Sequence, residues 1–328
     1  MTFGVRLLTA AVTCGVAALL ASTWALAQEP AEERRPKAEV SAGTWISVGT
    51  TTWAHNASSV SGLGNPTSKL TYKDVGTTVA EGAVKFWFNP RVFGRVNFGY
   101  GDIGGGRLTD DDYGTGQQLF SRTYSNLPGD NMYYLNFDLG ARVKEFANHR
   151  GWFDVFGGYQ YWHTKYTATG VTQVVCNPGA IPGLTCSVPG SVSNQGQTVI
   201  TNTTDWHSIR VGGTVEYFLT RRLAVHATGA FIPISVLNNR DVHHLRGDLQ
   251  QNPSFCMTGY GIGANADVGV RFMFNRHVAM DAGYRVYYNR VIDGDFKTYP
   301  VSGASQTFPL TQFDSLRHGV TFGLSVLF

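Results

Sequence analysis

The chain contains 328 residues, and its 26 Lys and Arg residues nearly balance its 23 Asp and Glu residues, which leaves a formal net charge of +3. So small an excess argues against a protein that binds nucleic acid by electrostatic attraction. The sequence is rich in glycine (39 residues), phenylalanine (20), tyrosine (15) and tryptophan (7), and it has no long apolar run after residue 27. This composition excludes a bundle of transmembrane helices and is typical of a transmembrane β-barrel.

The N-terminal segment, residues 1–27, has the three parts of a secretory signal peptide. Arg6 provides the positive charge, Leu7–Leu20 is apolar, and Ala25–Ala27 is an A-x-A cleavage site. We therefore expect residues 1–27 to be removed on export. The charged, Pro-containing segment 28–38 that follows is expected to be a flexible periplasmic lead-in.

From Val40 onward, apolar and polar residues alternate in long segments, as in strands with one face toward lipid. We expect ten strands, at about 40–53, 69–88, 91–108, 131–145, 151–169, 205–219, 223–237, 256–273, 277–292 and 313–328. Four short connections alternate with five long ones, at about 54–68, 109–130, 170–204, 238–255 and 293–312. Residues 39–328 are thus predicted to form a ten-stranded antiparallel barrel in a Gram-negative outer membrane, with five long extracellular loops.

The last predicted strand shows the alternation most clearly and ends on Phe328, which resembles the terminal aromatic that marks outer-membrane proteins for the barrel-assembly machinery. Several predicted strands place charges of both signs on the inward side: Arg210, Glu216, Asp267, Arg271, Asp281, Arg285 and Arg317. The interior of a ten-stranded barrel is narrow. We therefore expect these side chains to form a salt-bridged plug, and we do not expect a wide pore.

Three cysteines follow the signal peptide. Cys176 and Cys186 flank a turn-rich segment that can bring its ends together, and export permits a disulfide between them. Cys256 is left over and is expected to be a free thiol. None of the three has His or Cys neighbours at zinc spacing, so no metal site is expected.

Two short motifs carry the candidate chemistry: Asp110-Asp111-Asp112 and Asp241-Val242-His243. In a strand, residues i and i+2 point to the same side, so each motif can aim two ionisable groups at one place. His243 is suited to act as a general base near neutral pH, with Asp241 orienting its ring. Because two close carboxyls do not both ionise easily, Asp110 or Asp112 can stay protonated and polarise a carbonyl group.

An acidic motif in a loop is more often a solvated turn, and His244 competes with His243 for the role of base. Strand alternation also raises a conflict, since continuing it through either motif points the four side chains out of the barrel. A β-bulge at Gly104–Gly106 and another at Pro233 would reset the side. The catalytic hypothesis therefore requires both bulges.

The chain from Trp45 to Phe328 resembles the omptins, the ten-stranded outer-membrane proteases of Gram-negative bacteria, as a divergent member. The motifs that carry the resemblance are Ser68–Lys73, Gly104–Tyr113, Gly158–Gln160 with Thr167–Gly170, Asp241–Arg246 and Gly283–Arg285. By position, Asp110, Asp112, Asp241 and His243 match the catalytic pairs of that family. The resemblance implies hydrolysis of peptide bonds by an activated water, without an acyl-enzyme, metal or cofactor.

The sequence departs from that family at other positions. An acidic residue that selects basic substrates is replaced by Asn239, and the acidic and basic residues that bind lipopolysaccharide are replaced by Tyr161 and His163. The resemblance thus implies a protein in contact with outer-membrane lipid, with an altered substrate preference and an altered lipopolysaccharide site.

Two functions remain open. The first is an omptin-like endopeptidase, probed by whether the four side chains meet across the barrel mouth. The second is a non-enzymatic barrel, either a narrow channel or a surface structural or adhesion protein, and in both cases a monomer is expected.

Overall fold

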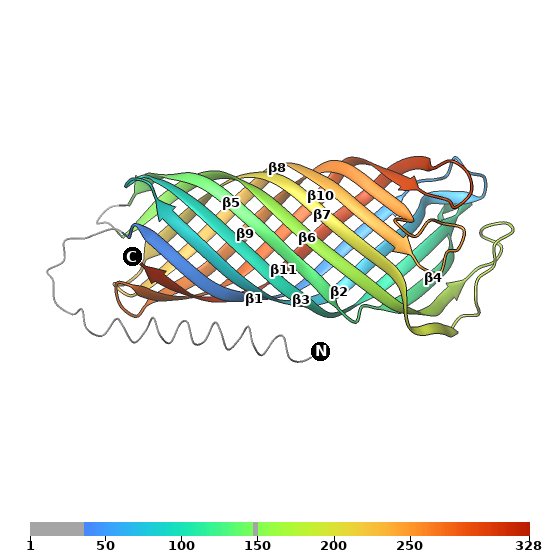
Figure 1. The fold of residues 1–328 in the computed structure, drawn as a ribbon, viewed down its shortest axis with the longest axis horizontal. Helices are drawn as coiled ribbons and strands as arrows, with labels where there is room; N and C mark the ends of the chain where they lie inside the picture. The colour runs from blue at the N-terminus through green and yellow to red at the C-terminus, as the bar shows by residue number, and fades with distance from the viewer. Residues whose placement is uncertain (1–35, 147–149) are drawn as a thin grey trace. The chain divides into compact units, whose positions relative to one another are not determined.

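The computed structural model describes residues 36–146 and 150–328 (Figure 1). The expected signal peptide, 1–27, and the expected lead-in as far as residue 35 lie outside the described residues. The first strand, β1, begins at Ala38. No helix within the described ranges is long and apolar enough to cross a membrane.

The described residues form an all-β fold with one short 3-10 turn, η2, at Thr115–Gln117. The strands are β1 (Ala38–His55), β2 (Leu63–Trp87), β3 (Val92–Gly114), β4 (Gln118–Asn126), β5 (Asp130–Glu145), β6 (Gly151–Cys176), β7 (Val192–Phe218), β8 (Leu223–His243), β9 (Phe255–Met273), β10 (Val278–Thr298) and β11 (Gln306–Leu327). Figure 1 shows them running obliquely around one barrel.

Antiparallel pairing closes the sheet into a ring, since β1 is hydrogen-bonded to both β2 and β11. The eleven strands occupy ten positions because β4 and β5 share one place between β3 and β6. Pro128 lies in the break between them, and proline has no N–H for a ladder hydrogen bond. The predicted ten-stranded antiparallel barrel is therefore confirmed, with its fourth strand interrupted.

All five predicted long loops were too long, and two of them differ most from the structure. In place of a loop at 109–130, β3 and β4 form a tight hairpin around η2, and in place of one at 170–204, only residues 177–191 separate β6 from β7. Both misjudged regions have polar residues on the outward face, such as Arg122 in the first and Thr203 in the second. Their composition resembles that of a loop, although much of their backbone is paired in ladders.

The structure contains both bulges that the catalytic hypothesis requires. In β8, Ile234 lies opposite Ile209 but Phe231 lies opposite Val211, so one extra residue is inserted beside Pro233. In β3, the buried side changes across Gly104–Gly106, where Gly105 and Gly106 have φ values of 153° and 156°. Beyond the bulges, Asp110 and Asp112 of β3 and Asp241 and His243 of β8 therefore lie on the inward side of their strands.

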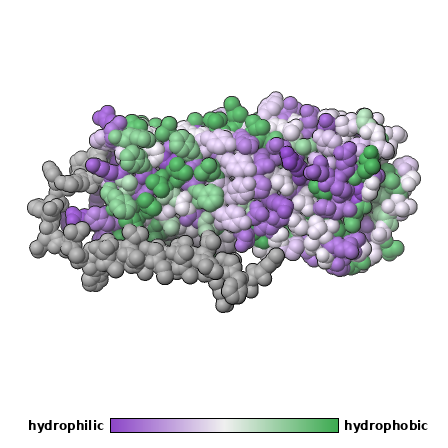
Figure 2. All heavy atoms as spheres, viewed as in Figure 1, coloured by the Kyte–Doolittle hydropathy of each residue, from purple (hydrophilic) through white to green (hydrophobic). Residues whose placement is uncertain are grey.

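The outward face has a continuous apolar band nearest the short turns. Its exposed members are Val40, Ile46, Val84, Phe86, Val96, Phe98, Phe137, Leu139, Val155, Ile209, Val211, Phe231, Val268, Val270, Met280, Val320, Phe322 and Leu324. Figure 2 shows hydrophobic residues covering much of the visible face toward the end where the C-terminus lies, and mainly hydrophilic or neutral residues toward the other end. Such a band is the feature by which a β-barrel contacts lipid.

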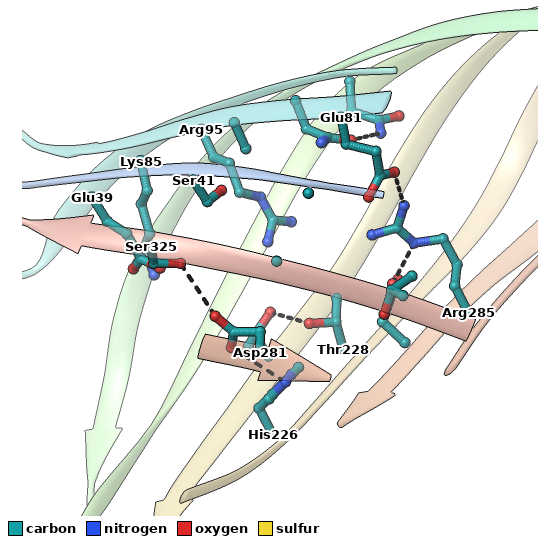
Figure 3. Close-up of a pocket in the computed structure, with 18 of the residues that line it drawn as sticks. Glu39, Ser41, Glu81, Lys85, Arg95, His226, Thr228, Asp281, Arg285 and Ser325 are labelled. Carbon is teal, nitrogen blue, oxygen red and sulfur yellow. Dashed lines mark hydrogen bonds and ion pairs between the residues drawn. The ribbon is translucent and has the colours of Figure 1, made fainter. Parts of the chain in front are cut away.

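Inside this band the barrel is ionic, as the sequence predicts. Asp138 is fully buried and accepts hydrogen bonds from both Arg95 and Arg210. Arg271 pairs with Glu39, Glu216 and Asp281, and Arg285 pairs with Glu81 and Asp267. These groups surround a cavity of about 260 Å³ (Figure 3).

Arg317 differs from the expected plug because it has no carboxylate partner among the described residues. Its Nη1 donates to the hydroxyls of Ser47 and Thr77 and to the carbonyl oxygen of Val75. It therefore lies between the ionic interior and the apolar core above it.

Beyond the apolar band, at the end that holds the β3–β4 hairpin, the sidedness is reversed. We call this part the upper barrel. Its interior is a cluster of large apolar side chains: Trp53, Leu70, Tyr72, Leu108, Trp162, Trp206, Leu237, Met257, Phe296 and Phe313. Its outward face carries polar residues such as Lys73, Arg107 and Arg240.

Candidate active site

The two candidate pairs come from opposite parts of the ring and lie at the same end of the barrel. Asp110 and Asp112 lie near the end of β3, and Asp241 and His243 end β8. Both pairs lie beyond the apolar band, in the upper barrel. The positive charge of His243 opposes the rise in the pKa of both Asp110 and Asp112, as expected for pairs that lie near each other at the mouth.

Asp241 and His243 form the first half of the site. Nε2 of His243 lies 3.1 Å from Oδ1 of Asp241, whose side chain is fully buried. Asn202 of β7 donates to Oδ2 of Asp241 at 2.6 Å. Ser254 fixes the backbone on either side, since its N–H donates to the carbonyl oxygen of Asp241 and its hydroxyl accepts from the N–H of His243. Asp241 is thus held in place to orient the imidazole.

Asp110 and Asp112 form the second half. The hydroxyl of Ser68, on β2, donates to Oδ1 of Asp112 at 2.5 Å. Oδ1 of Asp110 is buried and has no hydrogen-bond partner among the described residues. A buried carboxyl oxygen without a partner is costly unless a water or a substrate group supplies one. Asp110 is therefore the group on this wall that is free to contact a bound molecule.

The electrostatics assign different protonation states to the two walls. Burial raises the pKa of Asp110 well above its ordinary value, the charge of Asp112 raises it further, and His243 offsets only part of this. Burial also raises the pKa of Asp112, although the hydrogen bond from Ser68 opposes the shift. The raised pKa values favour the protonated form of one of these two carboxyls.

The pKa of His243 is raised, whereas burial alone would lower the pKa of a histidine. Burial alone lowers it, but the charges of Asp241 and Asp110 more than offset burial, and the net pKa is raised. A base of raised pKa holds the proton that it accepts more tightly, and it is neutral at pH values above that pKa.

The structure separates the candidates from their neighbours in sequence. Asp111 points to the outer face, where Arg122 donates to both of its carboxylate oxygens at 2.6 and 2.9 Å. His244 is exposed and its Nε2 lies 2.9 Å from the hydroxyl of Thr201. Neither faces the barrel mouth. Of these two motifs, only Asp110, Asp112, Asp241 and His243 can therefore act there.

The residues at the altered positions also have defined places. Asn239 is fully buried below Asp241 and donates to Asn202 and Thr204 at 2.9 and 2.8 Å. Tyr161 and His163 face outward and both contact Asp205, at 2.5 and 2.8 Å. Asn239 thus belongs to the site's supporting network, and the other two lie on the outer surface.

Two supporting residues were not foreseen. Ser68 and Asn202 hold one member of each pair, and both are cross-strand neighbours of the residues they bind. Their places depend on strand register, and a single serine or asparagine in a polar segment does not reveal that register.

The structure also pairs Cys176 with Cys186, and Cys256 is free. No cluster of three or more His, Cys, Asp or Glu side chains within the described residues could hold a metal ion.

Solved structures provide the comparison for this fold. The chain is similar to the outer membrane protease OmpT from Escherichia coli, with 15% identity and a TM-score of 0.71, covering 89% of this chain and 96% of that chain. Weaker similarities are to the translocator domain of the autotransporter NalP from Neisseria meningitidis (9% identity, TM-score 0.37, 97% and 98% covered) and to the toluene transporter TbuX from Ralstonia pickettii (9%, 0.33, 90% and 90%). No family model and no curated protein matches the chain. The structural neighbours are outer-membrane β-barrel proteins, and the similarity to OmpT establishes a shared fold.

Proposed function

We propose that this protein is an omptin-like endopeptidase of the outer membrane, which hydrolyses peptide bonds at the barrel mouth with water as the nucleophile. The observation that supports it most is that the Asp110–Asp112 pair on β3 and the Asp241–His243 pair on β8 lie at the same end of the barrel, with Nε2 of His243 3.1 Å from Oδ1 of Asp241. The similarity of the fold to a protease barrel adds to this support.

The proposed reaction assigns one role to each wall. His243 takes a proton from the water as its oxygen attacks the carbonyl carbon, and Asp241 stabilises the imidazolium that forms. Asp110, protonated because of its raised pKa, donates a hydrogen bond to the carbonyl oxygen as negative charge develops there. The imidazolium then gives its proton to the peptide nitrogen, the C–N bond breaks, and the products are a carboxylic acid and an amine.

Hydrolysis of a mixed peptide library by refolded protein tests the proposal. The assay is run with and without lipopolysaccharide, because the resemblance to omptins leaves its requirement open and the matching positions, Tyr161 and His163, are altered. His243→Ala, Asp241→Asn, Asp110→Asn and Asp112→Asn are each expected to reduce kcat/KM by about 10²-fold to 10⁴-fold. The matched controls are His244→Ala and Asp111→Asn, which change the same residue types on the outer face and should leave activity within about twofold. If no peptide is cut, or if the four site variants behave like the wild type, the proposal is wrong.

The alternative function is a narrow channel or a structural or adhesion protein, and the cavity of about 260 Å³ inside the apolar band is the observation that favours a channel. Paired charges line that cavity, and the apolar core of the upper barrel lies above it. In planar bilayers we expect the wild type to conduct only weakly. A large, steady conductance together with no peptidase activity would favour the channel.

A further inference from the structure

A row of aromatic side chains lies beside the proposed catalytic groups. Phe255 of β9 is the cross-strand partner of Asp241, and its ring lies 4.8 Å from the ring of His243. Phe296 of β10 lies 4.9 Å from Phe255 and stacks face to face on His55 of β1, with ring centroids 3.9 Å apart. Phe308 of β11 is the cross-strand partner of Phe296. We call His55, Phe255, Phe296 and Phe308 the aromatic wall.

The aromatic wall spans the arc of the ring that joins the two catalytic pairs. It starts next to Asp241 on β9 and ends at His55 on β1. The next strand position beyond His55 is Ser68, the residue that holds Asp112. A peptide lying between the two pairs would therefore have this wall along one side of it.

The wall offers an apolar surface and is not completely enclosed. Phe296 and His55 are 2% and 7% exposed and form its base, whereas Phe255 and Phe308 are only half-buried. Burial lowers the pKa of His55 to about 4, and the positive charge on nearby His243 lowers it as well. At neutral pH His55 is therefore uncharged, and no member of the wall presents a charge to a substrate.

Two features near the wall reduce its attraction for a basic substrate side chain. Arg246, on the segment after β8, is close enough for its charge to act on Asp110 and Asp112. Its own ion pair with Asp248 lies in an exposed position and is screened by solvent. Asn239, where an acidic residue would attract a basic side chain, is neutral and engaged with Asn202 and Thr204. A basic side chain at this position therefore lacks an acidic partner at residue 239 and meets the positive charge of Arg246, and its remaining attraction is to the carboxyl groups of the two pairs.

On the premise that the proposed peptidase function holds, we propose that the aromatic wall is the specificity site and selects a peptide bond flanked by a large apolar or aromatic side chain. Such a side chain would pack on the half-buried rings of Phe255 and Phe308. Phe255 lies next to the imidazole that activates the water. Apolar contact and ring-to-ring packing favour Phe, Tyr or Leu over Lys or Arg at that position. Phe255 and Phe308 are thus assigned as residues that determine specificity.

The test uses peptides that differ only at one residue beside the cleaved bond, which is Phe, Leu, Ala or Lys. For wild-type protein we expect kcat/KM to be about tenfold or more higher with Phe or Leu than with Lys. Phe255→Ala and Phe308→Ala should reduce kcat/KM with the Phe peptide several times more than with the Ala peptide, and Phe255→Leu should restore part of the difference. Tyr124→Ala is the matched control, because Tyr124 packs on Arg107 on the outer face of β4.

The outcomes separate the two proposals. If the wild type cuts none of the peptides, the peptidase function fails and the specificity site fails with it. If the peptides are cut but Lys is preferred, or if Phe255→Ala slows all peptides equally, the peptidase stands and the specificity site is wrong. The electrophoretic mobility of unboiled protein, compared for every variant, shows that the barrel has folded.

Discussion

The barrel consists of two regions built from the same strands with opposite sidedness. Within the apolar band, hydrophobic side chains face outward and ion pairs fill the interior, whereas in the upper barrel polar side chains face outward and an aromatic core fills the interior. The bulges at Pro233 and at Gly104–Gly106 lie where this change occurs in β8 and β3. The solvent around each region therefore decides which face of the strand is apolar, and a bulge allows one strand to serve both.

The difference also explains where reactive groups can be placed. In the ionic interior, each carboxylate of the central pairs is matched by a guanidinium, as Asp138 is by Arg95 and Arg210. At the mouth, Asp110 has a buried oxygen without a hydrogen-bond partner among the described residues, and its pKa is raised. A matched charge stabilises the barrel, while a carboxyl group without a partner above an apolar core is available for chemistry.

The largest expected difference between the two regions is the loss of stability when a charge is removed from the ionic interior. Asp138→Asn leaves Arg95 and Arg210 buried without a carboxylate, which is expected to reduce the free energy of unfolding by about 3–5 kcal/mol. Urea unfolding of the refolded barrel in detergent micelles measures this. Arg290→Ala, which breaks a more exposed ion pair with Asp314, is the control and should change it by no more than about 1 kcal/mol. Equal effects of the two substitutions would contradict the distinction between the regions.

The pH dependence of hydrolysis is the next largest expected effect. His243 must be neutral to accept a proton, and its pKa is raised, so activity is present above that pKa and is lost as the pH falls through it. We expect kcat/KM to fall about tenfold per pH unit on the acid side, with a midpoint above 6.5, the ordinary value for histidine. Asp241→Asn removes the charge that raises the pKa and should move the midpoint of any residual activity to lower pH. A profile that is flat between pH 6 and 9, or a midpoint below 6, would rule out His243 as the base.

A smaller effect is expected at Asn239, where a carboxylate would be added to the floor of the site. Asn239→Asp should increase cleavage next to Lys or Arg by about tenfold at most, because it restores an acidic partner for a basic side chain. The gain is limited because Asn239 donates two hydrogen bonds that aspartate cannot make. The ratio of kcat/KM for Lys and Phe peptides measures it, with Asn238→Asp on the outer face as the control. An unchanged ratio would show that Asn239 does not contribute to specificity.

The smallest effect on the barrel is expected from the disulfide. Cys176→Ser with Cys186→Ser opens the segment 177–191, which packs through Ala180 and Ile181 on Phe120. The barrel should retain its heat-dependent electrophoretic mobility, while this segment becomes more sensitive to added trypsin-like or subtilisin-like proteases. Loss of the heat-dependent mobility would show that the disulfide supports the barrel itself.

The sequence was sufficient to predict the closed barrel, because period-two alternation in strands such as β11 is strong. It was also sufficient to place Asp241 and His243 on one side of a strand, and to require a bulge at Pro233 for that side to face inward. It was insufficient for the hairpin at 109–130, because a strand in the upper barrel has a polar outer face that resembles a loop. The aromatic wall was also missed, since His55, Phe255 and Phe296 are far apart in sequence and only the ring's register brings them together.

The central claim is that the two pairs act on the same reacting group from opposite walls, and a double-mutant cycle in kcat/KM tests it most directly. Asp112→Asn, His243→Ala and the double variant are compared with the wild type on one peptide. Each single substitution is expected to reduce kcat/KM by about 10²-fold or more. If the pairs act as a unit, kcat/KM of the double variant should be no more than about threefold below that of the less active single variant. Losses that multiply, or single variants as active as the wild type, would contradict a shared site.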